Sequence, residues 1–200
     1  MANMNMLRVW GGGYYEDDRF YDLCDEYGIL IWQDFMFSCA QYPATEWYLA
    51  NVRKDVEFNI RRLRGRTCLA LWCGNNEIEW FLAGGFGGEK NAVYKEDYSK
   101  IFHQAIPEMV GKLDPDVSYW PSSPSSNEPF VDPNAQDRGD GHYWEVWHGR
   151  QPFTAYRTQF HRFMSEFGFE SLPDIETCRS FAPEDQLNIT SPIMESHQKN

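Results

Sequence analysis

The chain has 200 residues and a formal net charge of −12, and this length suffices for one sizeable domain whose core can bury a parallel sheet. The negative balance excludes the basic surface that nucleic acids and anionic membranes require, so neither is expected as a partner. No apolar run approaches the roughly 18 residues that span a bilayer. We therefore expect a soluble protein, and its compartment is left open.

The sequence predicts neither a metal ion nor a cofactor. The histidines show no H-E-x-x-H motif and no zinc-type Cys/His spacing. The glycine clusters at 11–13 and 84–88 fail both nucleotide-binding fingerprints, and no G-x-S-x-G elbow is present. The five cysteines have no repeated spacing, so we expect buried, reduced thiols.

Short apolar runs alternate with amphipathic stretches in the first half of the chain. This alternation is typical of βα units and a parallel sheet. The first helix is expected to end at Gly28, because glycine adopts the left-handed conformation that closes helices. The predicted elements are a strand at 7–10, a helix at 17–26, a strand at 29–35, a helix at 46–64 and a strand at 67–73.

The second half continues the same alternation with a long polar insertion. Residues 125–140 are rich in turn formers and are expected to form a functional loop. The tail from residue 183 has no clear periodicity. The other predicted elements are a glycine-rich loop at 83–90, helices at 94–113, 153–161 and 174–181, and strands at 117–120, 142–147 and 163–167.

The chain thus contains six strand-like runs. They fit an α/β fold, either a doubly wound open sheet or an incomplete (β/α)8 barrel, and the count alone does not decide between them.

Two glutamates follow predicted strands and are the candidate catalytic groups. Glu77 comes after the buried run LALWC and two asparagines, and Glu166 lies near the end of the last predicted strand. A glutamate at a strand end is more often solvated or salt-bridged than catalytic. Two of them at the carboxyl ends of barrel strands would converge on one rim, where glycoside hydrolysis needs a protonated and an ionised carboxyl group.

Aromatic residues near the predicted strand ends suit a sugar-binding cleft. Trp10, Trp120 and Trp144 lie at or near such ends, although packing inside a sheet or barrel is an equally frequent role for tryptophan. Asn76 adjoins Glu77 and has an amide that can bind a substrate hydroxyl.

Three longer motifs resemble the β-mannosidase branch of glycoside hydrolase family 2. They are NMLRVWGGGYYEDDRFYDLCDEYGILIWQDFMF, LALWCGNNE and FMSEFGFES, and the resemblance extends from about residue 5 to residue 199. It implies a retaining exo-enzyme that removes terminal β-linked mannose from the non-reducing ends of β-mannosides, with a (β/α)8 catalytic barrel.

The resemblance also assigns roles to residues. Glu77 matches the acid/base, Glu166 the nucleophile, and Asn76 the asparagine that contacts the sugar 2-hydroxyl. If retaining chemistry applies, the two carboxyl groups are expected about 5–5.5 Å apart. Arg8 matches an arginine beneath the glycone pocket, and the residues expected to line the pocket are Trp10, Asp34, Trp120, His142 and Trp144.

In the register of this family the six predicted strands are the second to the seventh of the barrel. The chain is therefore expected to be a single partial barrel domain over residues 1–200, without the family's flanking β-sandwich domains. An open barrel exposes strand edges, which predicts poor solubility or completion by another chain.

Two alternatives to an active β-mannosidase remain open. The first is a related exo-glycosidase: a β-galactosidase, a β-glucuronidase or an exo-β-glucosaminidase. The second is an inactive fragment that binds sugar weakly through its tryptophans. Family members are lysosomal, periplasmic or cytoplasmic, so the resemblance does not fix the compartment.

Overall fold

The computed structural model describes residues 3–169 and 171–198. The chain divides into two compact units. The first comprises Met1–His142 and Gln159–Ser165, and the second comprises Tyr143–Thr158 and Glu166–Asn200. The expectation of one partial domain over the whole chain stays a prediction.

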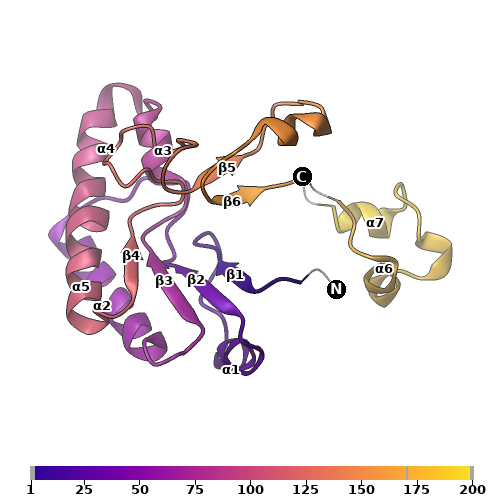
Figure 1. Ribbon diagram of the computed structural model, residues 1–200, viewed down its shortest axis with the longest axis horizontal. Helices are drawn as coiled ribbons and strands as arrows, with labels where there is room; N and C mark the ends of the chain where they lie inside the picture. Colours follow the sequence, from indigo (N-terminus) through magenta and orange to yellow (C-terminus); the bar gives the residue numbers. More distant parts are fainter. Residues whose placement is uncertain (1–2, 170, 199–200) are drawn as a thin grey trace. The chain divides into compact units, whose positions relative to one another are not determined.

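A four-stranded parallel sheet organises the first unit (Figure 1). Its strands lie side by side in chain order, as successive βα units require. The α/β class and the parallel pairing are therefore confirmed. The strands are β1 (Met6–Val9), β2 (Leu30–Asp34), β3 (Leu69–Cys73) and β4 (Ser118–Trp120), and each pairs in parallel with the next.

The first two helices begin and end where local sequence signals place them. Helix α1 (Asp18–Tyr27) starts after Asp17, whose carboxylate accepts a hydrogen bond from the backbone of the first turn. It ends at Gly28, whose φ of 66° lies in the left-handed region that favours glycine. Helix α2 (Glu46–Leu63) starts in the same way after Thr45.

The helix expected at 94–113 is one helical segment with an irregular centre. It consists of α4 (Asn91–Tyr98), a π-helical stretch (Ser99–Ala105) and α5 (Ile106–Leu113). Pro107 lies at the start of α5 and has no N–H to give to the preceding turn, which suits the break in the α-helical ladder. Helix α3 (Ile78–Ala83) and a short 3₁₀ helix (Gly88–Lys90) were not predicted.

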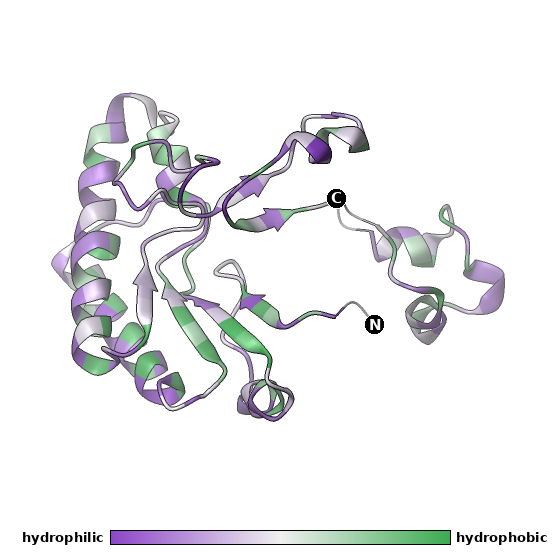
Figure 2. Ribbon diagram, viewed as in Figure 1, coloured by the Kyte–Doolittle hydropathy of each residue, from purple (hydrophilic) through white to green (hydrophobic). Residues whose placement is uncertain are grey.

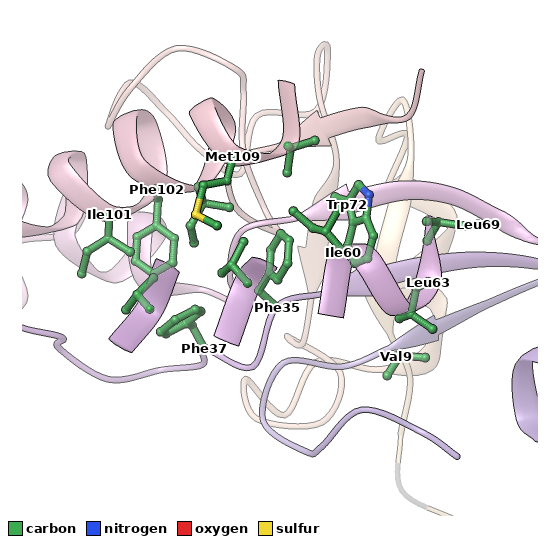
Figure 3. Packing of buried hydrophobic residues seen from close by; sticks show 14 of the residues in the cluster. Val9, Phe35, Phe37, Ile60, Leu63, Leu69, Trp72, Ile101, Phe102 and Met109 are labelled. Carbon is green, nitrogen blue, oxygen red and sulfur yellow. The ribbon is translucent and has the colours of Figure 1, made fainter. Parts of the chain in front are cut away.

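The core of the first unit lies between the sheet and the helices that cover it. Figure 3 shows Ile60 and Leu63 of α2 pointing toward the same interior as Trp72 of β3. Phe35, just after β2, stacks on Trp72 with ring centroids 5.0 Å apart. Apolar residues accordingly concentrate on β2 and β3 (Figure 2).

Strands β5 (Gly141–Tyr143) and β6 (Met164–Phe167) form a separate two-stranded sheet. The prediction of a strand through residue 147 was wrong beyond Tyr143, because the chain turns there. The amide of His148 donates to the carbonyl oxygen of Trp144 at 2.7 Å. The rings of Trp144 and Trp147 then meet at 5.6 Å, a contact between residues three apart that an extended strand does not allow.

The remaining predictions were partly right. The helix expected at 153–161 is a 3₁₀ helix (Phe153–Thr158), and the one expected at 174–181 is α6 (Ile175–Phe181), which starts after Asp174. The tail contains a 3₁₀ turn (Glu184–Gln186) and the short α7 (Pro192–Ser196). All five cysteines are free and four are buried, but Cys39 is exposed. Among the described helices, none combines the length and apolar character needed to cross a bilayer.

Substituting Ile60→Ala tests the packing of α2 on the sheet. Ile60 is fully buried, so its truncation should lower the free energy of unfolding by about 2–5 kcal/mol, measured by urea denaturation. Phe58→Ala is the matched control, because Phe58 lies on the same helix but is 66% exposed, and its loss should cost no more than about 0.5 kcal/mol. Equal losses in the two variants would contradict this packing.

Candidate active site

The segment after β3 is held between the segments that follow β2 and β4. On one side, the backbone amide of Asn76 donates to the carbonyl oxygen of Phe37 at 2.9 Å. The backbone amide of Cys39 donates to the carbonyl oxygen of Asn76 at 3.0 Å. On the other side, the amide of Glu77 donates to the carbonyl oxygen of Ser123 at 2.8 Å. These bonds continue the parallel sheet past its strands and fix Glu77 at the carboxyl edge.

Glu77 has an unusual backbone and a nearly enclosed side chain. Its φ of 64° and ψ of −2° are left-handed, a conformation that is uncommon for a residue with a Cβ. The chain thereby leaves the strand and enters α3. One carboxyl oxygen, Oε1, lies 2.9 Å from Nδ1 of His142, and the other accepts a hydrogen bond from the thiol of Cys39 at 3.5 Å.

Cys39 was not predicted as a site residue. The residue as a whole is exposed, but its sulfur lies against Glu77 and accepts a hydrogen bond from the side-chain amide of Asn76 at 3.4 Å. Loss of hydration around the sulfur raises the pKa of the Cys39 thiol, so the protonated thiol is the form that donates to Glu77.

His142 is buried, and both of its ring nitrogens make hydrogen bonds. Besides the contact with Glu77, Nε2 lies 2.9 Å from the hydroxyl oxygen of Ser123. Its backbone is held by Asn134, whose side chain bonds both the amide and the carbonyl of His142 at 2.8 and 2.9 Å. The two contacts hold the ring between Ser123 and Glu77.

A buried ion pair supports the other side of Glu77. Asp34 is fully buried and binds Nη2 of Arg8 at 2.8 Å, and it also accepts from the indole of Trp32 and the amide of Gly11. The same Nη2 donates to the side-chain oxygen of Asn76 at 2.8 Å. Asp34 and Arg8 thus orient Asn76, the residue next to Glu77.

A second buried carboxylate, that of Asp140, lies near β4. It accepts hydrogen bonds from the indole of Trp120 at 2.8 Å, the hydroxyl of Ser123 at 2.6 Å, the amide of Ser125 at 2.9 Å and the hydroxyl of Ser165 at 2.5 Å. Trp120 and Asp140 line a pocket of about 420 Å³ in the first unit, and Glu77 is not among its lining residues. The predicted role of Trp120 in substrate binding stays a prediction.

The glycines after β1 make room for Trp10. A Cβ on Gly12 would lie only 2.0 Å from the indole ring of Trp10, and one on Gly11 would lie 2.6 Å from the carbonyl oxygen of Phe37. The ring of Trp10 is about half exposed and lines an open pocket of about 400 Å³ together with Arg8. The glycine run therefore allows close packing around Trp10 and Phe37.

Glu166 and Trp144 belong to the second unit. Glu166 lies on β6, and Trp144 follows β5. The indole nitrogen of Trp144 donates to Oε2 of Glu166 at 3.3 Å. The first unit thus brings together Arg8, Asp34, Asn76, Glu77 and His142, and the second brings together Trp144 and Glu166. The catalytic and substrate-binding roles of these residues stay predictions.

Glu79, in the first turn of α3, is a buried carboxyl group close to the site in sequence, and the sequence analysis did not identify it. Its carboxyl group accepts from the hydroxyl of Tyr98 at 2.9 Å and from the amide of Phe130 at 3.0 Å. Burial raises the pKa of Glu79 and lowers the pKa of His103, whose Nε2 is 3.9 Å away. Tyr98 in turn accepts from the side chain of Asn75, which also bonds the amide of Ile78.

The raised pKa of Glu79 predicts a pH dependence of stability. The stabilising contribution is fully present below the ordinary value of 4.5 and is lost as pH rises through the higher folded pKa. The measured quantity is the difference in free energy of unfolding between the unmodified chain and Glu79→Gln. This difference should fall as pH rises. Glu89→Gln, at an exposed position, should give a difference that stays flat. A flat difference for Glu79→Gln as well would count against this account.

The chain is similar to proteins named β-mannosidase. Beta-mannosidase B of Aspergillus clavatus is 39% identical over 205 residues, covering 97% of this chain and 24% of that protein. The beta-D-mannosidase structure from Dictyoglomus thermophilum is 47% identical with a TM-score of 0.84, covering 98% of this chain and 24% of that one. A beta-glucuronidase of Bacteroides uniformis has a TM-score of 0.56 at 16% identity over 81% of this chain and 20% of its own, which shows a shared fold alone.

No protein-family profile matches the chain. The identities with the two β-mannosidases nevertheless extend over almost all of it. The chain is therefore related along almost its whole length to β-mannosidases and spans about a quarter of the length of these relatives.

Proposed function

We propose that this chain carries the catalytic segment of a retaining β-mannosidase, with Glu77 as acid/base and Glu166 as nucleophile. The observation that carries the proposal is the set of contacts around Glu77, whose carboxyl group faces a buried histidine at 2.9 Å. The relatedness to proteins named β-mannosidase supports the substrate class, a terminal β-linked mannose.

Hydrolysis proceeds in two displacements under this proposal. The carboxylate of Glu166 attacks the anomeric carbon, while Glu77 gives its proton to the leaving glycosidic oxygen, so that a covalent glycosyl ester forms. Glu77, now ionised, removes a proton from water as the water oxygen attacks the same carbon. Glu166 leaves as a carboxylate, and the mannose is released with Glu77 protonated again.

The surrounding residues suit this chemistry. Asn76 is oriented by Arg8 and Asp34, so its amide is fixed beside the acid/base, as a contact to a sugar hydroxyl requires. Asp34 is fully buried and accepts hydrogen bonds from Arg8, Gly11 and Trp32, and we propose that it acts by holding Arg8 and not by touching substrate. The half-exposed ring of Trp10 offers an apolar face to the sugar.

We further propose that the parallel sheet is part of a (β/α)8 barrel. The chain-order arrangement of β1–β4 is the one a barrel uses, and chemistry at the carboxyl edge follows the rule of that fold. Because the chain spans about a quarter of its relatives' length, the remaining strands, or another chain that supplies them, would complete the pocket.

Removing either carboxyl group tests the assignment. Glu77→Ala and Glu166→Ala, each made in the gene product that carries this chain, should lower kcat for an aryl β-mannoside by at least about 10²-fold. Glu89→Ala is the control at an exposed glutamate and should leave the rate unchanged. Added azide should partly restore turnover in Glu166→Gly by replacing the nucleophile. Unchanged hydrolysis in both alanine variants would overturn the proposal.

A panel of aryl glycosides separates this specificity from its relatives. The β-mannoside should have the highest kcat/KM of a set that also includes the β-galactoside, β-glucuronide and β-glucosaminide. A preference for one of the other three would keep the glycosidase assignment but change the substrate.

A further inference from the structure

We propose that Asp140 is a positioning residue that acts on Glu77 through Ser123 and His142, and that this chain of contacts keeps one proton between His142 and Glu77. The role of this proton in catalysis rests on the function proposed above. The direction of each hydrogen bond in the chain of contacts does not depend on that function. The four side chains lie in the first unit, and consecutive members are 2.6, 2.9 and 2.9 Å apart.

The chain of contacts starts from a carboxylate that can only accept. Asp140 is buried and receives four hydrogen bonds, two on each oxygen, from one indole, one amide and two hydroxyl groups. Four acceptor sites are what an ionised carboxylate offers, and a protonated one would have to donate one of these bonds instead. Four donors around one carboxyl group favour its ionised form, in which each contact carries its proton on the partner.

Ser123 passes this constraint on. Its hydroxyl group has a single proton, and the contact of 2.6 Å with Asp140 requires that proton because the carboxylate has none. Ser165 also lies 3.3 Å from the Ser123 hydroxyl, but that contact is longer, and the proton of Ser165 is likewise directed to Asp140. The oxygen of Ser123 is thus left to accept from Nε2 of His142 at 2.9 Å.

The protonation of His142 then determines what lies next to Glu77. With a proton on Nε2, a neutral ring has only a lone pair on Nδ1, so the contact of 2.9 Å with Oε1 requires a protonated Glu77. If Glu77 is ionised, Nδ1 must carry the proton and the ring is an imidazolium. Either way one proton lies between the two side chains. That proton is the one the first displacement needs.

The ring is also prevented from turning out of this arrangement. His142 is 1% exposed, and the side chain of Asn134 fixes its backbone at both the amide and the carbonyl. A flip of the ring would exchange its nitrogens for carbons and leave both Ser123 and Glu77 without these bonds.

Nitrogen NMR of the imidazole tests the order of protons directly. In the unmodified chain at neutral pH, Nε2 of His142 should be protonated, with the signal assigned by its loss in His142→Gln. Asp140→Asn removes the acceptor for Ser123, so its hydroxyl turns to donate to Nε2 and the proton of the ring moves to Nδ1. The exposed His148 serves as an internal control that should not change. An unprotonated Nε2 in the unmodified chain, or an unchanged tautomer in a folded Asp140→Asn, would overturn the proposal.

Leaving-group dependence tests the catalytic consequence. Asp140→Asn in the gene product should lower kcat by about tenfold or more for an aryl β-mannoside with a poor leaving group, because that leaving group needs the proton. For an aryl β-mannoside with an activated leaving group, kcat should change by no more than about twofold. A merely structural defect would lower both alike, and such a result would contradict the positioning role. If Glu77→Ala leaves turnover intact, the proposed function fails while the NMR result still stands.

If Asp140→Asn does not fold, the NMR and kinetic measurements can be made on Ser123→Ala instead. It leaves Asp140 with three donors and removes only the hydroxyl group that reaches His142. The expected result is a mixture of ring tautomers and the same selective loss with the poor leaving group. A single Nε2-protonated form with unchanged kinetics would show that Asp140 does not act through Ser123.

Discussion

The burial of two negative charges decides how the carboxyl edge of the sheet is built. Asp34 and Asp140 are both withdrawn from water, and an unmatched carboxylate in that position costs several kcal/mol. Asp34 is matched by Arg8 from the neighbouring strand, and Asp140 by hydroxyl, indole and amide donors. Because these donors come from different segments, none can shift without exposing a charge to an apolar interior. Glu77 lies between the two clusters and takes its position from both.

Much of the first unit follows from local sequence. The apolar runs that end at residues 10, 35, 73 and 120 become β1–β4 because short apolar runs bounded by turn residues favour strands. Helix α1 begins at its aspartate and ends at its glycine because side-chain caps and a left-handed residue act within a few positions. The location of Glu77 at the carboxyl edge was predictable for the same reason.

The parts that escaped prediction depend on contacts between distant residues. Ser123 and Asp140 are 17 residues apart in the chain, and neither belongs to a motif that marks it as a partner of His142. The aromatic run 142–147 has the composition of a strand, yet its rings pack in a turn. Helix α3 is short, and a window of six residues carries too little periodicity to identify it.

The left-handed backbone of Glu77 sets the catalytic role proposed for this residue against the stability of the chain. A residue with a Cβ gives up roughly 1–2 kcal/mol in this conformation relative to glycine, so selection for a more stable chain alone would replace this glutamate. Laboratory evolution for heat resistance, carried out without an activity screen, would accordingly drift toward glycine or asparagine here. A parallel population that is also screened for turnover should keep glutamate at residue 77.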